Sequence, residues 1–316
     1  MFRRVVVPLD GSRLAECALP HAIALCQALA AHPVLLRVVQ GEAANDNAYP
    51  ADPLEWEALR LEAPTYLAGI ADRLLAHGLE AETVTLEGAP VEQIVDFVQT
   101  GPPTLLVLST HGCGGVSGWV LGGVAQRAAL HARVSFLLVR AYVAGQPASD
   151  AFIYTRMLVP LDGSRRAECV LAFVEALARQ HDAEIVLVSV VPAGQALPQN
   201  GQRRLSEWAT AQRESIERYL DGIAERLGNE GLRVTSRVEI DASPAYAIQR
   251  IARTEQVDLM VMAAHGTSCS ACWQFGAVPL STIVYGETPL LVVQDLSPEE
   301  IQPTQAERAA REIWGH

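Results

Sequence analysis

Residues 105–115 read Leu-Leu-Val-Leu-Ser-Thr-His-Gly-Cys-Gly-Gly, an apolar run that ends in a glycine-rich segment. Further glycines follow at 118, 122 and 123, and residues 124–131 and 134–139 can form a helix and another apolar strand. A short apolar run of this kind is typical of a parallel strand that is buried on both faces. Glycines let several backbone N–H groups point at one place, and a helix that starts there adds its positive end. The stretch predicts a strand, a phosphate-compatible loop, a helix and a strand.

A second copy of this stretch lies in the other half of the chain. The apolar run 259–262 is followed by Ala263-Ala264-His265-Gly266, then by Gly276 and by the apolar run 290–293. The interval from His265 to Gly276 equals the interval from His111 to Gly122. The loop is therefore duplicated.

The beginning of each half is repeated as well. The sequence Val-Val-Val-Pro-Leu-Asp-Gly-Ser at 5–12 returns as Met-Leu-Val-Pro-Leu-Asp-Gly-Ser at 157–164. In each copy the Asp-Gly-Ser turn ends a strand and caps a helix. Strand and helix patterns alternate through both halves, which implies parallel sheets with right-handed crossovers.

The repeat divides the chain into two α/β domains, residues 1–140 and 155–294, with a linker at 141–154 and a tail at 295–316. The expected strands cover residues 4–9, 34–39, 83–86, 105–108, 134–139, 157–161, 185–191, 234–240, 259–262 and 290–293. The expected helices cover residues 12–31, 53–77, 91–99, 124–131, 164–181, 203–227 and 244–254. Pro64 predicts a kink or a break in the second of these helices.

Composition limits the classes of function. The 316 residues suffice for about two domains, and 19% charged with 50% hydrophobic residues is an ordinary globular balance. No apolar run approaches the roughly 20 residues of a membrane span, and the N-terminal residues lack the pattern of a signal peptide, so we expect a cytoplasmic protein without a membrane partner. A formal net charge of −12 disfavours nucleic acid as a partner.

The motifs together resemble the universal stress protein family. They are Pro8-Leu9-Asp10-Gly11-Ser12, Glu87-Gly88-Ala89-Pro90 before a helix, and 106–112, Leu-Val-Leu-Ser-Thr-His-Gly, with Leu121-Gly122. The resemblance covers nearly the whole chain except linker and tail, and so identifies a tandem member. It implies two doubly wound α/β domains, each with a five-stranded parallel sheet flanked by helices.

One subclass of that family binds ATP through Gly, two residues, Gly, nine residues, Gly and then Ser or Thr. Here Ser109 replaces the first glycine and Gly123 replaces the hydroxyl residue, whereas the inner two glycines match. The resemblance implies nucleotide-binding residues in the first half, and these are Pro8, Asp10, Val38, Ser109, Gly112, Gly115, Gly122, Gly123 and Val124. The second half departs further from the pattern and offers a weaker site, which consists of Asp162, Val190, Gly266 and Gly276.

The aspartates and histidines near the two loops also have a purely structural interpretation. Asp10 and Asp162 cap helices whether or not they bind a ligand. His111 and His265 each precede a loop glycine without an evident nucleophile or orienting carboxylate, which favours a polar loop contact over catalysis.

The cysteines favour packing over metal binding or reactivity. His265 with Cys269 and Cys272 supplies three of the four ligands that a structural zinc site needs, so we predict no metal, and a redox or metal role of the two cysteines stays open. The matched positions of Cys17 and Cys169 favour core packing.

We therefore predict a non-catalytic, cytoplasmic stress-response protein that binds an adenine nucleotide, ATP with or without Mg²⁺, and prefers the first half. Two alternatives stay open: a nucleotide-free interaction or scaffold protein, and a slow ATP hydrolase. The two domains are expected to pair within the chain, with a homodimer of chains as a further option.

Overall fold

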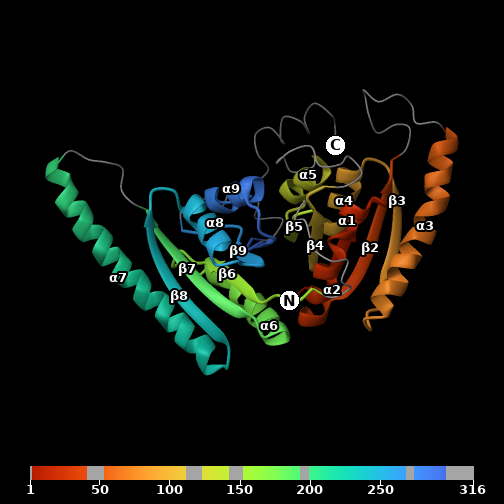
Figure 1. Cartoon of the computed structure of the whole chain (residues 1–316). Coiled ribbons are helices and arrows are strands. Elements are labelled where there is room, and N and C mark those ends of the chain that lie inside the picture. Colours follow the sequence, from red (N-terminus) through yellow and green to blue (C-terminus); the bar gives the residue numbers. More distant parts are fainter. Residues whose placement is uncertain are drawn as a thin grey trace. The chain divides into compact units, whose positions relative to one another are not determined.

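The computed structural model describes residues 2–40, 53–111, 123–141, 152–192, 199–267 and 274–296. The chain divides into two compact units, one ending at Ile153 and the other beginning at Tyr154 (Figure 1). Each unit has α/β architecture, as the alternating sequence pattern predicts. Within the described residues, no helix combines the length and the apolar character needed to cross a bilayer.

The described part of the first unit holds five parallel strands in the order β3-β2-β1-β4-β5. Their bounds are β1 Arg4–Pro8, β2 His32–Val39, β3 Glu82–Glu87, β4 Thr104–Ser109 and β5 Ser135–Val139. Each strand predicted from the sequence is present within one or two residues of these bounds.

The second unit repeats this arrangement, and its described strands run in the order β8-β7-β6-β9-β10. Their bounds are β6 Arg156–Pro160, β7 Glu184–Pro192, β8 Arg233–Asp241, β9 Leu259–Ala263 and β10 Leu290–Val293. The register is repeated too, because Pro8 lies opposite Leu36 and Pro160 lies opposite Val188. The doubly wound fold expected for both halves is confirmed.

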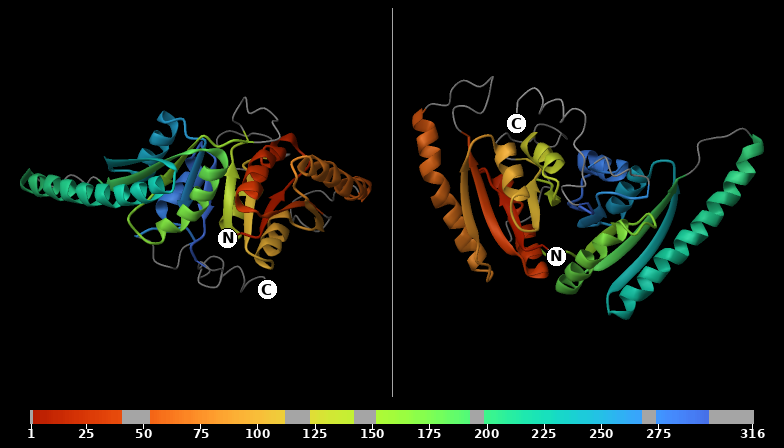
Figure 2. Two further views of the ribbon diagram at one scale, coloured as in Figure 1. Left: turned by 90° about the horizontal axis from the view of Figure 1, so that it is seen from below. Right: turned by 180° about the vertical axis from the view of Figure 1, so that it is seen from behind.

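Helices cover both faces of each sheet (Figure 2). In the first unit they are α1 Arg13–Glu16, α2 Leu19–Leu29, α3 Pro53–Leu75, α4 Pro90–Gln99 and α5 Gly123–His131. The connections that carry α2 and α3 step toward β3, and those that carry α4 and α5 step toward β5. Right-handed crossovers therefore place α2 and α3 on one face and α4 and α5 on the other.

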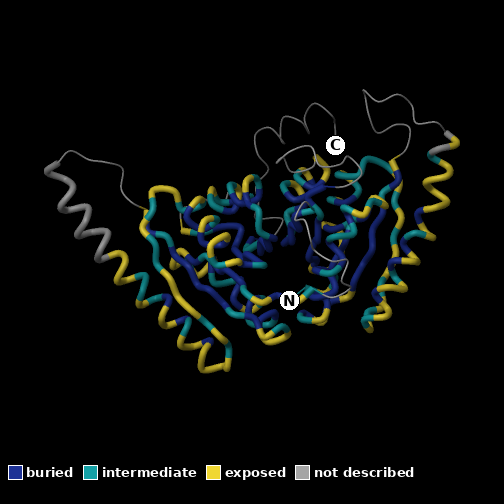
Figure 3. Tube along the Cα trace, viewed as in Figure 1, coloured by how far each residue is buried: buried dark blue, intermediate teal, exposed yellow. Residues whose placement is uncertain are grey.

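In the second unit the corresponding elements are the 3₁₀ helix η1 Ala167–Val170, α6 Leu171–His181, α7 Gln199–Asn229, α8 Pro244–Thr254 and α9 Ala277–Tyr285. The long helix α3 packs on β2 and β3, and the long helix α7 packs on β7 and β8. Figure 3 shows that the outward turns of α3 are exposed.

Three helix predictions need correction. The helix expected at 164–181 begins as the 3₁₀ helix η1 and continues as α6. The single helix expected at 12–31 is divided into α1 and α2, because Pro20 lies in the first turn of α2, where a missing N–H costs least. Pro64 does not break α3, which continues from Pro53 to Leu75. Pro64 and Arg60 are exposed, so water can hydrate the Arg60 carbonyl that loses its helical donor.

Burial explains which strands are central. The side chains of Val5, Val6 and Val7 in β1 and of Leu105 and Leu106 in β4 are fully buried, as expected between two helical layers. In contrast, β3 alternates between exposed and partly buried residues, which is the pattern of an edge strand. The continuous apolar runs in the sequence therefore mark the centre of each sheet.

The imidazole of His21 in α2 belongs to the core of the first unit. It is fully buried and stacks on Phe152, with 4.2 Å between the ring centroids and 27° between the planes. Burial lowers the pKa of His21 from 6.5 to about 4. The folded protein therefore holds this imidazole in its neutral form at neutral pH.

His21 should make stability depend on pH between 6.5 and 4. Since its folded pKa lies below its ordinary value, the unfolded chain binds the proton more readily, and stability that is complete above pH 6.5 is lost as the pH falls toward 4. The full loss is on the order of 3 kcal/mol. Urea unfolding at several pH values should show a shallower pH dependence for His21→Leu than for the parent. Equal pH dependence in both proteins would contradict this assignment.

Candidate functional site

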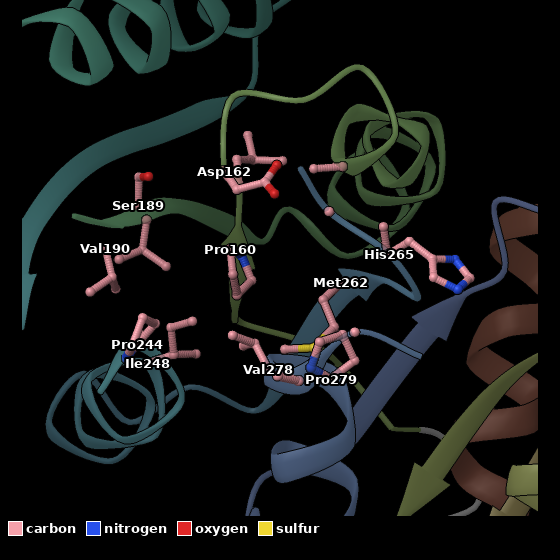
Figure 4. A pocket seen from close by; sticks show the side chains of 17 residues that line it. Pro160, Asp162, Ser189, Val190, Pro244, Ile248, Met262, His265, Val278 and Pro279 are labelled. Carbon is pink, nitrogen blue, oxygen red and sulfur yellow. The ribbon is translucent and has the colours of Figure 1, made fainter. Parts of the chain in front are cut away.

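A cavity of about 150 Å³ lies in the second unit, beyond the carboxyl ends of β6, β7 and β9 (Figure 4). Strand order reverses at β6, because β7 lies on one side of it and β9 on the other. In open parallel sheets, ligands bind at such a reversal. Most of the side chains on the cavity wall are apolar, and they include Pro160, Val188, Val190, Pro244, Ile248, Met262, Val278 and Pro279.

Asp162 supplies the carboxylate of the cavity. It directly follows Leu161 at the end of β6, and Gly163 adopts a positive φ of 83° that turns the chain into η1. Its Oδ1 accepts hydrogen bonds from the backbone N–H and the hydroxyl of Ser164, at 3.0 and 2.6 Å. Its Oδ2 accepts a hydrogen bond from the backbone N–H of Thr267 at 2.5 Å. One carboxylate thus connects the two loops that face each other across the cavity.

These hydrogen bonds determine the charge of Asp162. Partial burial alone would raise its pKa, but the bonds from Ser164 and Thr267 stabilise the anion more, so the pKa lies below its ordinary value of 3.8. The carboxylate is therefore ionised at neutral pH. The side chain of Thr267 also donates a hydrogen bond to this carboxylate, so donors from Ser164 and Thr267 surround it.

Gly266 is required by this connection. A Cβ at this position would overlap Oδ2 of Asp162. Gly276, which also lines the cavity, is less constrained, since a Cβ there would lie 3.6 Å from both the Ala264 carbonyl oxygen and Pro279 Cδ. Its N–H donates to that carbonyl at 2.8 Å, which fixes the start of α9.

The N-terminus of α9 borders the cavity at Ala277 and Val278. The first backbone N–H groups of a helix have no acceptor within the helix, and they carry the positive end of its dipole. Pro279 has no N–H, so two residues of the first turn, Ala277 and Val278, can offer donors to an anion. The arrangement suits a ligand with an apolar body, hydroxyl groups and a negative end.

His265 has a partner that the sequence did not reveal. Its Nδ1 lies 2.5 Å from Oδ1 of Asp295, which follows β10, and both side chains are almost fully buried. The expectation that this histidine lacks an orienting carboxylate is therefore wrong, because the parallel pairing of β9 with β10 brings together residues 30 positions apart. Figure 4 shows the imidazole pointing away from the other labelled side chains.

The first unit holds part of the predicted nucleotide site within the described residues. Asp10 is exposed and its Oδ1 accepts the Ser12 N–H at 2.9 Å. The prediction that Asp10 caps the helix is wrong, because the N-cap of α1 is Ser12, whose hydroxyl accepts the Ala15 N–H at 3.1 Å. Pro8 and Val38 are half-buried at the ends of β1 and β2. Gly112, Gly115 and Gly122 lie outside the described residues.

The other predicted residues of the first unit lie at the ends of β4 and α5. The Ser109 hydroxyl lies 2.8 Å from the Leu14 carbonyl oxygen and 2.7 Å from that of His111, so it donates within the protein. Gly123 and Val124 begin α5 and are exposed. The site in the first unit remains a prediction.

The two units differ beside the Asp-Gly-Ser turn. In the first unit Arg37, only 7% exposed, packs against Gly11, where a Cβ would lie 3.0 Å from its Nη1. The equivalent strand residue of the second unit is Ser189, which borders the cavity. There Ile216 approaches instead, with its Cδ1 3.8 Å from a Cβ placed on Gly163. The strand position that borders the cavity in one unit thus carries a long cation in the other.

The described cysteines are free thiols that burial holds in the protonated form. Burial raises the pKa of Cys17, and it raises the pKa of Cys26 and of Cys169 to about 12. This agrees with packing rather than reactivity. Cys269 and Cys272, with Trp119 and Trp273, lie outside the described residues.

Gly266→Ala should destabilise the second unit by about 1 to 3 kcal/mol, because the new methyl group displaces the Asp162 carboxylate from Thr267. Gly276→Ala is the matched control and should cost less than about 1 kcal/mol, the effect of alanine at a helix N-cap. Urea unfolding measures both. The Gly266→Ala cost should shrink in an Asp162→Ala background, and an unchanged cost there would show that this contact is not its cause.

Three comparisons place this geometry among known proteins. A universal stress protein of Methanocaldococcus jannaschii is 29% identical over 143 residues, which cover 44% of this chain and 83% of that protein. The crystal structure of a universal stress protein from Archaeoglobus fulgidus is similar in fold, with a TM-score of 0.64 and 17% identity over 93% of this chain and 99% of that chain. A universal stress protein in complex with cAMP is 25% identical, with a TM-score of 0.35 over 44% of this chain and 97% of that chain.

The family profile gives the decisive match. The profile of the universal stress protein family matches residues 1–140 and again residues 153–294. The two matched segments contain the two sheets and both Asp-Gly-Ser turns. The chain belongs to the universal stress protein family, as a tandem member with two copies of the family fold.

Proposed function

We propose that this universal stress protein binds an adenine nucleotide without converting it, at a tighter site in the first unit and a weaker site in the second. The observation that supports this proposal most directly is the cavity of the second unit, which joins an apolar wall, the ionised Asp162 and the start of α9. A nucleotide has the matching parts, which are an apolar base, a ribose with hydroxyl groups and a phosphate.

The chemistry of the cavity assigns each part of the ligand a place. Val190, Ile248 and Met262 belong to an apolar wall that suits the faces of a purine. A ribose hydroxyl or the adenine amino group would donate to Asp162 in place of the Thr267 side chain, and the N–H groups of Ala277 and Val278 suit a phosphate. The volume of about 150 Å³ is below the roughly 300–1,000 Å³ of sites that enclose drug-sized ligands, so the polyphosphate would lie at the mouth.

For the first unit the proposal rests on the family motif. ATP, with or without Mg²⁺, would bind where Ser109, Gly112, Gly115, Gly122 and Gly123 form the glycine loop. Asp10 would hold the adenosine, with Pro8, Val38 and Val124 around it. Four glycines, 114, 115, 118 and 122, lie between Gly112 and Gly123, whereas Gly276 alone lies between Gly266 and Ala277. The richer loop favours a tighter grip on phosphate.

A bound nucleotide should not be converted at the cavity, because the imidazole that could act as a base does not point toward it. Among the described residues that line the cavity, the imidazole belongs to His265, and Figure 4 shows its ring pointing away from the other labelled side chains. It is therefore poorly placed to activate a water at a phosphate.

The cytoplasm is the proposed compartment, because the free thiols of Cys17, Cys26 and Cys169 suit reducing conditions. We also propose that the two units pair through β5 and β10, the last strand of each unit.

The two sites can be separated with one matched pair of substitutions. Val38 and Val190 occupy equivalent positions, and a tryptophan at either would fill the base site of its own unit. In calorimetric titrations with ATP, after removal of co-purified nucleotide, Val38→Trp should lose the tighter phase and Val190→Trp the weaker one. Absence of binding in the parent would favour the scaffold alternative, and release of ADP would favour the hydrolase.

Asp10 provides a second test. Asp10→Asn keeps the oxygen that accepts the Ser12 N–H but loses the negative charge, so the turn that leads into α1 should survive. Loss of a charged hydrogen bond to the adenosine should weaken ATP binding by about 1 to 3 kcal/mol. The thermal midpoint reports on the turn, and the titration reports on the ligand. Unchanged affinity would show that Asp10 only holds this turn.

A further inference from the structure

Helix α3 has two apolar faces, although a helix that covers one side of a sheet needs only one. The face toward the sheet consists of Ala63, Leu67, Ile70 and Leu74, each at most 4% exposed. Leu61 and Leu75 are 70% and 56% exposed. At 3.6 residues per turn these two leucines lie on the side of the helix opposite the buried face.

The exposed leucines belong to a regular stripe, which we call the outer stripe. Leu61, Ala68 and Leu75 are spaced by seven residues, and Leu54, 79% exposed, continues the spacing toward the start of the helix. Ala58 is also exposed on this side. Residues spaced by seven lie in one row along a helix, and such a row is one of the two apolar positions per heptad along which helices pack lengthwise.

Helix α7 gives an internal comparison, because it is the duplicate of α3. Its buried face keeps the same residues, with Leu220, Ile223 and Leu227 at the positions of Leu67, Ile70 and Leu74. On its outer side the stripe is replaced by charge, and Glu214 and Asp221 stand where α3 has Leu61 and Ala68. Both charged residues are exposed.

This contrast separates the outer stripe from ordinary surface variation. The fold requires only the buried face, which both helices share. An exposed helix side needs no leucine, as α7 shows, and a row of exposed apolar side chains costs solubility unless something covers it.

We propose that the outer stripe of α3 pairs with the same stripe of a second copy of this chain, with the two helices antiparallel about a two-fold axis. Such an interface uses one surface twice, so the surface must be complementary to itself. In an antiparallel pair centred between Pro64 and Thr65, Leu61 of each copy faces Ala68 of the other. A large side chain then packs on a small one, which lets the helices approach closely.

The size of the stripe determines the strength of the association. From Leu54 to Leu75 the helix is roughly 32 Å long, so one side of it can bury on the order of 400 Å² per copy. Stable complexes bury about 800 Å² per partner, so the dimer is weak and depends on concentration. In the same register Glu57 faces Asp72 of the other copy, and salt should therefore strengthen the association by screening this repulsion.

Sedimentation velocity over a wide concentration range tests the pairing. The parent should self-associate reversibly in the micromolar range, more strongly as salt is raised. Leu61→Glu with Ala68→Asp gives α3 the residues of α7 and should weaken the association by about tenfold or more, because charges would be buried without partners. The control is Glu214→Gln with Asp221→Asn on α7, which should leave it unchanged. Circular dichroism checks that each variant is folded.

A compensating pair tests the register. Leu61→Lys and Ala68→Glu should each weaken the dimer, and the double variant should restore it, because an antiparallel pair places the lysine of one copy against the glutamate of the other. A parent that stays monomeric at every concentration would overturn the proposal and leave the stripe to a helix of another protein. Self-association that the Leu61→Glu, Ala68→Asp variant does not change would also overturn it.

Discussion

Burial of the central strands on both faces is the constraint on which each unit depends. β1 and β4 in the first unit, like β6 and β9 in the second, carry continuous apolar runs that only a helix on either side of the sheet can cover. The crossovers that bring those helices also reverse the strand order at β1 and β6. Loops that leave the strands at this reversal cannot close over one another, so the packing of the core also creates the opening that a ligand can use.

The carboxylate after the first strand links this architecture to the chemistry of the site. Asp162 receives hydrogen bonds from its own turn and from the loop after β9, so the same group orients Ser164 before η1 and holds two loops together. The structural and the ligand-binding interpretation of this aspartate are therefore not alternatives.

Much of this could be predicted from the sequence, because it depends on local patterns. Apolar runs located the central strands, and the repeated Asp-Gly-Ser turns located the strand ends around the site. Asp295 could not be found in this way, because its contact with His265 depends on the pairing of β10 with β9. Neither could the cavity be assigned to the second unit, since glycine content favoured the first, and the space that Ser189 leaves is visible only in three dimensions.

Different side chains occupy the space next to Gly11 in one unit and next to Gly163 in the other, which bears on how the duplicated halves diverged. In one unit a side chain from the second strand, Arg37, occupies this space, and in the other a side chain from the long helix, Ile216, does so. The equivalent position in the other unit is small in each case. Ser189 is the counterpart of Arg37, and Ala63 is the counterpart of Ile216. Suppose that recombination between the two halves of the gene exchanged β2 for β7 without exchanging α3 for α7. The space would then either be crowded by two large side chains or be left empty. The two copies can therefore exchange these segments only together, which would keep them distinct as they diverge.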